Sequence, residues 1–300
     1  MRRLFTIILC LTFISAYSQY YEVGTFVGLS NYSGDLNEGS PMIPQEYNPA
    51  IGMFARYNFS RNFSMKVGLT KGQISGSDKN ADLEELTMRN LSFRSDIIEV
   101  ATTFEFNLLP FAIREKKKSA PYLFLGVGGF HFNPQGQMRG NWYDLQPLGT
   151  EGQGYSSLGN TPRYSRYQVS FPMGIGFKFN LNNKVNFGFE FGARKTFTDY
   201  LDDVGGMYPD LDMLRAENPI AASLSYRTPE VSTIPMTNPE GRMRGNPGNQ
   251  DWFFFMGMTI SVNMTDKYGL DFDEKYDVFK TDFTPVVKKD TSKKKKRKKR

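Results

Sequence analysis

The sequence predicts an all-β protein: an eight-stranded antiparallel transmembrane β-barrel of an outer membrane, with long extracellular loops. Three observations predict this fold. Eight segments alternate apolar and polar residues with a period of two, the pattern of a strand with one apolar face. The connections between them are alternately short and long, as in outer-membrane barrels. After residue 18, no apolar run approaches the roughly 20 residues that a membrane-spanning helix requires.

Residues 1–18 have the features of a secretory signal peptide. Two arginines follow the first methionine, residues 4–14 are apolar, and Ala16 and Ser18 are small residues at the positions that a signal peptidase reads. We therefore expect cleavage after Ser18 and export. Cys10, the only cysteine, lies in this segment. The exported chain is then expected to have no disulfide, thiol nucleophile or thiolate metal site.

The first four expected strands alternate without interruption. They cover residues 20–30, 50–59, 63–73 and 96–108. Their apolar faces carry, in order, Val23 and Val27, Met53 and Tyr57, Val67 and Leu69, and Val100 and Phe104. The opposite faces carry glycine, small polar and charged residues. In a membrane barrel the apolar face meets lipid and the polar face lines the lumen.

The last four expected strands follow the same rule. They cover residues 121–133, 163–181, 185–200 and 251–264. In the third of these, Phe187, Phe189 and Phe191 fall on one face, while Glu190 and Arg194 fall on the other.

The segment 121–133 departs from a single parity. Its apolar residues change phase at Gly128 and Gly129, which leaves Phe130 and Phe132 on the other face. The pair of glycines predicts a β-bulge at this point.

The connections fall into two classes. The short ones cover residues 60–62, 112–120 and 182–183, and the long ones cover 31–49, 74–95, 134–162 and 200–250. Short turns lie on the periplasmic side of outer-membrane barrels, so we expect both termini in the periplasm. The last long connection contains one short helical segment, residues 210–218.

The polar faces predict a charged lumen. It would hold Glu22, Arg56, Lys66, Glu99, Glu105, Arg166, Lys178, Glu190 and Arg194. Eight strands leave an interior that side chains just fill, and buried charges require partners. We therefore predict a structural plug of ion pairs. A path for protons or ions is the alternative.

Residues typical of catalysis are few. His131 is the only histidine, and it falls within an expected strand. The acids at positions 199, 202, 203, 210 and 212 could bind calcium through oxygen atoms, but they lack the spacing and central glycine of a calcium loop. Turns and helix caps are the simpler interpretation. We expect no catalytic residue, no metal ion, no cofactor and no small-molecule substrate.

The end of the chain differs in composition from the expected barrel, residues 19–264. Residues 265–300 contain 13 basic and 7 acidic residues, whereas the barrel segment has a net charge of −2. An acidic linker with spaced aromatic residues, 265–287, leads to a basic block. The block consists of Lys293, Lys294, Lys295, Lys296, Arg297, Lys298, Lys299 and Arg300. We expect a disordered periplasmic tail that binds a partner protein, lipid phosphate or the cell wall; a solvated end is the alternative. Export makes a nucleic-acid partner unexpected.

Three segments resemble the DUF6089 outer-membrane proteins of the Bacteroidetes. They are "YYEVGTFVGLSNYSGDLN" (20–37), "LQPLGTEGQG" (145–154) and "EFGARKTFTDYLDDVGG" (190–206). The resemblance covers roughly residues 20–264 and leaves the tail outside. It implies a non-enzymatic barrel, embedded in outer-membrane lipid, that anchors the periplasmic ring of the type IX secretion system. That ring is built from the lipoprotein PorK and its partner PorN, and the machinery also serves gliding motility. A free-standing surface adhesin or envelope-stabilising barrel is the alternative.

Overall fold

The computed structural model describes most of the expected barrel. The described residues are 20–37, 43–111, 118–182, 184–233 and 238–264. The predicted signal peptide and the tail with its basic block lie outside them.

Eight long strands form the barrel. In chain order they are β1 (Tyr20–Ser33), β2 (Asn48–Asn58), β3 (Phe63–Ser77), β4 (Ser92–Asn107), β5 (Ser119–Met138), β7 (Tyr167–Asn180), β8 (Val185–Thr196) and β9 (Trp252–Met264). A short strand, β6 (Asn141–Asp144), pairs with the end of β5.

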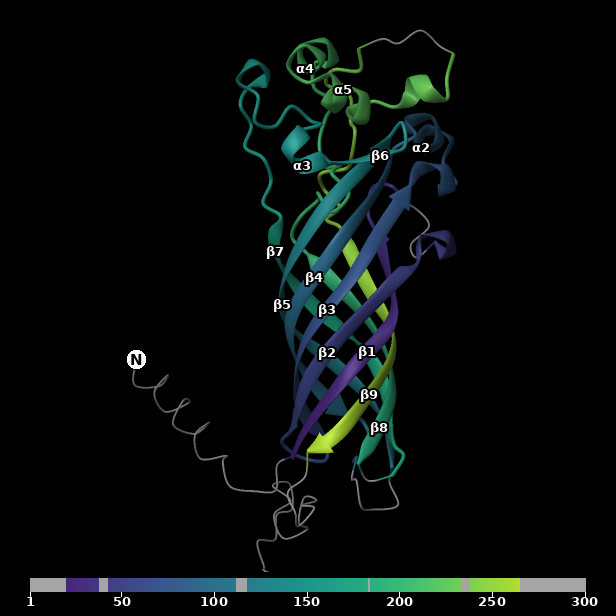
Figure 1. The fold of residues 1–300 in the computed structure, drawn as a ribbon, viewed down its shortest axis with the longest axis vertical. Helices are drawn as coiled ribbons and strands as arrows, with labels where there is room; N and C mark the ends of the chain where they lie inside the picture. Colours follow the sequence, from purple (N-terminus) through teal and green to yellow (C-terminus); the bar gives the residue numbers. More distant parts are fainter. Residues whose placement is uncertain (1–19, 38–42, 112–117, 183, 234–237, 265–300) are drawn as a thin grey trace, which may run out of the picture.

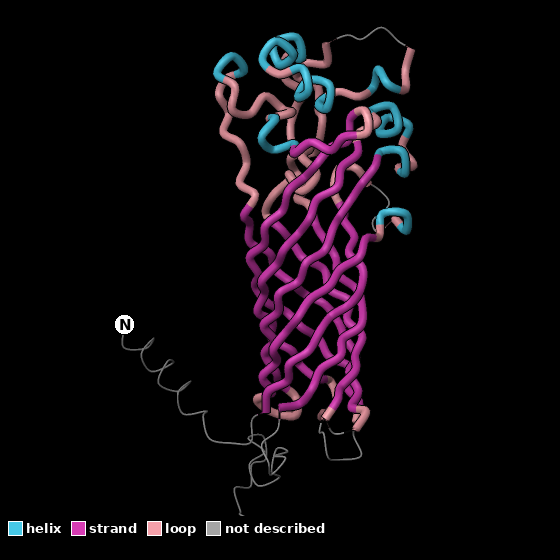
Figure 2. The backbone as a smooth tube through the Cα atoms, in the orientation of Figure 1, coloured by secondary structure: helices cyan, strands magenta, loops and turns pink. Residues whose placement is uncertain are grey.

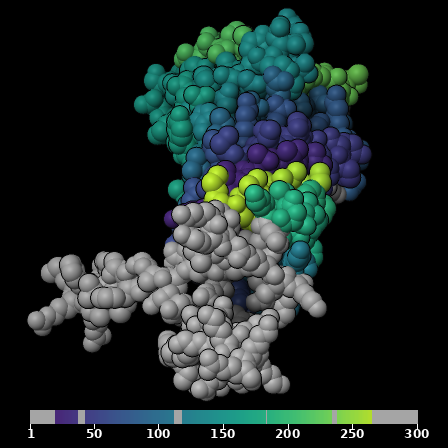
Figure 3. All heavy atoms as spheres, turned by 60° about the horizontal axis from the view of Figure 1, so that its bottom comes forward, coloured from purple at the N-terminus to yellow at the C-terminus, as the bar shows by residue number. Residues whose placement is uncertain are grey.

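The sheet closes on itself. Each barrel strand is antiparallel to the next, and β9 pairs with β1 from Tyr21 opposite Met264 to Ser33 opposite Trp252. Viewed from below, the yellow β9 lies between the purple β1 and the green β8 (Figure 3). Every barrel strand is therefore paired on both sides, as a sheet in a bilayer must be. The prediction of an eight-stranded antiparallel barrel is confirmed.

Short helices gather at one end of the barrel (Figures 1 and 2). They are η1 (Pro44–Glu46), η2 (Asp78–Asn80), α2 (Glu84–Arg89), α3 (Leu145–Leu148), η3 (Ser156–Leu158), α4 (Leu211–Glu217), α5 (Pro219–Ser225) and η4 (Thr228–Glu230). We call this the loop end and the opposite end the turn end. The predicted helix at 210–218 is α4, and Asp210 caps it by accepting bonds from the backbone N–H groups of Asp212 and Met213.

No helix in the described part of the chain is long and apolar enough to cross a membrane.

A belt of apolar side chains faces outward around the barrel. Leu125, Ile175 and Val100 remain 67%, 58% and 54% exposed. Large apolar side chains this exposed, over a whole circumference, match the lipid-facing band of a transmembrane barrel. On β3 and β4 the belt gives way toward the loop end to an exposed ion pair, Lys71–Asp96. The strands therefore continue beyond the bilayer at the loop end.

Two sequence predictions about the strands were wrong. β3 extends to Ser77 instead of ending at residue 73, and β4 begins at Ser92 instead of residue 96. Polar residues beyond the belt continue the same pairing. β5 contains no bulge: its pairing with β4 runs without a break from Asn107 opposite Tyr122 to Arg94 opposite Gln135.

Candidate functional site

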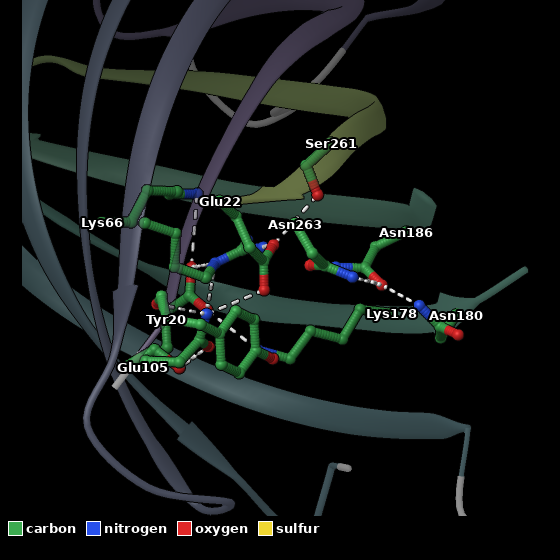
Figure 4. Close-up of polar contacts among 12 residues, drawn as sticks. Tyr20, Glu22, Lys66, Glu105, Lys178, Asn180, Asn186, Ser261 and Asn263 are labelled. Atoms are coloured by element: carbon green, nitrogen blue, oxygen red, sulfur yellow. Dashed lines mark hydrogen bonds and ion pairs between the residues drawn. The ribbon is translucent and has the colours of Figure 1, made fainter. Parts of the chain in front are cut away.

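The charged side chains nearest the turn end form one ion-pair cluster inside the barrel (Figure 4). Arg56 on β2 donates through Nη1 to Glu22 Oε2 at 2.7 Å and pairs through Nε with Glu105 Oε2 at 2.9 Å. Lys178 on β7 lies 3.3 Å from Glu105 Oε2. All four side chains are at most 2% exposed. The four side chains come from β1, β2, β4 and β7, and the alternation of each strand points its charged group to the same place inside the barrel.

A second pair extends this cluster. Lys66 pairs with Glu190, and its Nζ lies 3.8 Å from Glu105 Oε1. Tyr122 Oη donates to Glu190 Oε2 at 3.0 Å. Glu190 therefore receives a charged and a neutral donor, which offsets part of the cost of burying it.

A separate pair lies closer to the loop end. Arg194 Nε is 3.2 Å from Glu99 Oε2, and Ser170 Oγ donates to Glu99 Oε1 at 2.8 Å. A cavity of about 40 Å³ touches both this pair and the Lys66–Glu190 pair. Its size suits a few water molecules. Thr103 Oγ1, which lines the cavity, has no protein partner among the described residues, so water there would satisfy it.

The eight charged residues of these clusters balance. Four carboxylates, Glu22, Glu99, Glu105 and Glu190, face four cations, Arg56, Lys66, Lys178 and Arg194. Each is bonded to at least one opposite charge, so the interior is neutral.

Arg166 is the exception among the nine predicted lumen residues. It precedes β7, is partly exposed, and donates from Nη1 to Asn133 Oδ1 at 2.8 Å. Asn133 belongs to the outward-facing parity of β5. The prediction that Arg166 lies in the lumen was wrong, because β7 starts at Tyr167, four residues after the predicted start at 163, and Arg166 lies outside the strand.

Aromatic side chains fill the barrel above the ion pairs. The tilted rings of Phe130 and Phe253 pack with centroids 5.1 Å apart, and the ring centroid of Phe253 lies 5.6 Å from that of Phe255. These rings and Phe132 are at most 3% exposed and join an apolar core that continues into the loops through Leu201. Phe130 and Phe132 therefore face the interior, as the unbroken alternation of β5 requires, and the predicted change of phase does not occur. They are apolar because the interior of the barrel is itself apolar beyond the membrane.

The long connections fold over the loop end into a cap, held by the buried Arg244 and the partly buried Arg89. Arg244 donates from Nη1 to Glu151 Oε1 at 3.0 Å and to the backbone oxygen of Asp203 at 2.5 Å. Arg89 donates from Nη2 to Asp78 at 2.7 Å and to the backbone oxygen of Asp35 at 2.8 Å. Arg89 Nη1 also donates to the backbone oxygen of Arg244 at 2.6 Å, so together these bonds connect all four long connections.

Buried carboxylates also concentrate in the cap. Tyr32 Oη donates to Asp202 Oδ2 at 2.5 Å and lies 3.4 Å from Asp251 Oδ1. Burial and the neighbouring carboxylates raise the pKa of Asp202 and of Asp251 well above the ordinary range. Burial also raises the pKa of Asp203 to about 6, although Arg244 opposes this shift. The cap therefore gathers buried carboxyl groups whose ionised forms are disfavoured.

The histidine and the acids that the sequence suggested as candidate site residues do not lie together in the structure. His131 faces outward beside Tyr167, with ring centroids 4.8 Å apart. Asp210 caps α4, and the exposed Asp212 pairs with Arg215. Of the acids considered for calcium, only positions 199, 202 and 203 are buried in the cap.

Sequence reasoning missed the cap cluster and the aromatic layer. The layer had a signal, because Phe26, Phe253 and Phe255 follow the lumen parity of their strands. The cap had none, since Tyr32 and Asp251 lie 219 residues apart in the chain.

The chain is similar in sequence to one known protein family. A family model described as a domain of unknown function, DUF6089, matches residues 1–144 and 152–220. A comparison with curated proteins found no match. The match ends at residue 220, short of the expected 264, and the segment 145–154 falls largely between its two stretches.

Several solved structures are similar in fold. Ail, the attachment invasion locus protein of Yersinia pestis, is 9% identical with a TM-score of 0.39, over 82% of this chain and 99% of Ail. Neisserial surface protein A is 7% identical with a TM-score of 0.38, over 81% of this chain and 96% of that protein. The outer membrane protein OprG from Pseudomonas aeruginosa is 8% identical with a TM-score of 0.35, over 83% and 98%. At these values the likeness adds nothing to what the strand pairing and the apolar belt establish.

Proposed function

The chain belongs to the DUF6089 family, and from this membership we propose that it is a non-enzymatic outer-membrane subunit of the type IX secretion and gliding machinery. In this proposal it is most like PorG, and it anchors a PorK-like and PorN-like periplasmic ring to the membrane. The turn end faces the periplasm.

The filled lumen is the observation that supports an anchoring role. Paired charges and packed aromatic rings occupy the barrel from the turn end to the cap. Such an interior gives a rigid body in the bilayer rather than a conduit. A rigid barrel that stays in place in the membrane is what an anchor requires.

The position of the chain ends supports the same role. β1 begins and β9 ends at the turn end, with Tyr21 opposite Met264. Residues 265–287 would reach up to about 75 Å if extended, enough to carry the basic block away from the membrane. An acidic surface on a periplasmic assembly is the partner that eight consecutive cations fit best.

Truncation after Met264 is expected to separate the barrel from its partners. The shortened protein should still insert and resist heat, because the ion pairs, aromatic layer and cap all lie before this point. Ring proteins that co-purify with the full chain in mild detergent should be reduced, and secretion should fall. Quantitative mass spectrometry of matched membrane preparations measures both.

A matched control replaces the eight basic residues of the block with glutamine and keeps the length. It should reproduce the truncation if charge carries the contact. Equal recovery of ring proteins by full-length, truncated and neutralised chains would contradict the role of the tail and direct attention to the basic connection 112–120.

A surface-binding role is the second candidate. Met207 and Met243 pair through an isolated β-bridge on the cap, and each is 60% exposed. Exposed apolar side chains on an ordered surface are suited to binding another protein. Purification without ring proteins, but with retention of cells or matrix on the immobilised barrel, would favour this role.

A further inference from the structure

Three arginines line one open pocket of the cap, which we call the arginine pocket. Arg139 comes from the turn between β5 and β6, Arg215 from α4, and Arg227 from the residue that precedes η4. The pocket has a volume of about 540 Å³, within the range of small-molecule sites. Its other lining residues are Met138, Ala222, Ser223, Tyr226, Pro229 and Glu230. Three elements of the loop end therefore bring positive charge to one depression of the surface (Figure 1).

The arginine pocket carries more positive charge than its own carboxylate neutralises. Glu230, the only acid among the described residues that line it, accepts from Nε and Nη2 of Arg227 at 3.0 and 2.9 Å. Arg215 donates from Nη1 to Asp212 at 2.9 Å, which engages one of the three nitrogen atoms of its guanidinium. Arg139 is exposed, and its side chain has no ion pair or hydrogen bond within the described part of the chain. Two cations are therefore available to a ligand.

The backbone at Arg139 has a conformation that arginine does not favour. Met138 pairs with Asn141, so Arg139 and Gly140 form a two-residue turn, with φ angles of 51° and 83°. Positive φ at both positions is typical of a type I′ turn, whose first position favours asparagine, aspartate or glycine. The other non-glycine residues with positive φ in the described chain are Asn90, Asn160 and Asp203. Arginine in this turn thus costs backbone free energy that asparagine would not, which points to a use for its charge.

The elements around the arginine pocket are held in place by packing and hydrogen bonds. α5 packs against β5, where a Cβ atom at Gly136 would lie 3.2 Å from Leu224 Cδ2. Arg227 donates from Nη1 to Ser92 Oγ at 3.1 Å, which connects its segment to the start of β4. A ligand would therefore meet walls that are already formed, and binding would require little rearrangement of the cap.

The lining favours an anionic group carried on a sugar. Guanidinium groups bind phosphate and sulfate oxygens through pairs of N–H donors. The pocket is larger than a single inorganic ion, so the anion would be part of a larger molecule. Tyr226, packed edge-on against Tyr208 with ring centroids 5.6 Å apart, offers a fixed apolar surface for a sugar ring. Ser223 donates to the backbone oxygen of Pro219 and can still accept a bond from a sugar hydroxyl.

Distance from the bilayer favours a ligand from the surrounding medium over a lipid headgroup. Val127, 52% exposed, is the belt residue of β5 nearest the loop end, and Arg139 follows it by 12 residues. At about 3.3 Å per residue and a strand tilt of about 40°, Arg139 lies about 30 Å beyond the belt. The headgroup region of one leaflet is only about 5–8 Å thick. The pocket is therefore well clear of the headgroups.

We propose that the arginine pocket binds a phosphate or sulfate ester of a soluble glycan. Arg139 and Arg215 pair with the ester oxygens, while Arg227 stays bonded to Glu230 and forms part of the wall. The sugar ring lies against Tyr226. This site is at the opposite end of the barrel from the anchoring proposed above, and it requires neither the tail nor a periplasmic ring.

Ligand-observed NMR tests the proposal on the full-length protein in non-ionic detergent, with glucose 6-phosphate, glucose 6-sulfate and glucose as probes. Both esters should bind and glucose should not, and binding should weaken as salt rises from about 20 to 300 mM. Arg139→Asn should weaken binding of both esters at least about tenfold. Arg242→Asn, at an exposed arginine of the cap outside the pocket, is the matched control and should bind as the parent does. The basic tail is the same in all three proteins, so the difference between them reports the pocket.

Hydrogen exchange locates the ligand and separates lost binding from a folding defect. Glucose 6-phosphate should slow amide exchange in residues 136–142 and 222–230 of the parent. Without ligand, Arg139→Asn should exchange no faster there than the parent, because asparagine suits the turn. Absence of protection in these segments of the parent, or equal binding of the esters by Arg139→Asn, would overturn the proposal.

A competition experiment separates a soluble glycan from a membrane lipid. Lipid A, added in mixed micelles, should not displace glucose 6-phosphate from the parent. Displacement would overturn the assignment to a soluble ligand and give the arginine pocket to phosphorylated headgroups. None of these results depends on ring proteins, so failure here leaves the anchoring role untouched.

Discussion

Replacing Arg56 with alanine is expected to destabilise the barrel by about 3–5 kcal/mol, because it leaves two carboxylates buried without their main counter-charge. Glu22 and Glu105 are 0% and 1% exposed, and both pair with Arg56. Lys178 is bonded to Glu105 but not to Glu22, so it compensates only one of them. The loss is therefore larger than for a charge pair at the surface.

Equilibrium unfolding in urea, in the presence of phospholipid vesicles, measures this effect. Arg166→Ala is the matched control, since Arg166 is partly exposed and bonded to Asn133, and its change should stay within about 0.5 kcal/mol. Arg194→Ala breaks the smaller pair with Glu99 and should cost about 1–4 kcal/mol, which keeps the test open if Arg56→Ala does not fold. Stabilities equal to the parent for both lumen variants would contradict a paired plug.

Replacing Arg244 with alanine is expected to loosen the cap and leave the barrel intact. Arg244 is 3% exposed and bonds Glu151, the backbone oxygen of Asp203, and the backbone oxygen of Ser225. Its loss leaves a buried carboxylate unpaired, a local cost of about 3 kcal/mol or more. Amide exchange in the cap should then be at least about 100-fold faster, while exchange in the strands stays the same.

Hydrogen exchange followed by mass spectrometry compares the two regions in one experiment. Arg215→Ala provides the control, because Arg215 forms only an exposed pair with Asp212 within α4. Slow exchange in the cap of Arg244→Ala would show that the apolar core beneath the connections, including Leu201 and Val204, holds them without the arginine.

Alternation predicted the strands and the lumen charges because a period of two fixes which face each side chain meets. Eight of the nine predicted charged residues lie inside the barrel, and Arg166 does not, since parity has no meaning outside a strand. The same rule failed at Phe130. It assumed that apolar side chains face lipid, whereas beyond the membrane the interior itself is apolar.

The cap was beyond prediction for a different reason. Its bonds join residues from separate connections, such as Tyr32 with Asp202, 170 residues apart. No local pattern encodes such contacts, because they depend on how four loops pack over one opening. Asp199 was considered as a calcium ligand from its neighbours in sequence, yet its neighbours in space include Asp35 and Glu151.

Electrical recording in planar bilayers tests most directly whether paired side chains, rather than a continuous water path, fill the lumen. The full-length protein is expected to give no stable single-channel steps, because Arg56, Glu105 and Lys178 block the barrel near the turn end and Phe130, Phe253 and Phe255 block it toward the cap. An empty bilayer and a bilayer with a known porin set the two limits. Stable conductance steps of porin size from the folded protein would contradict the closed barrel and, with it, the interpretation of this molecule as an anchor rather than a channel.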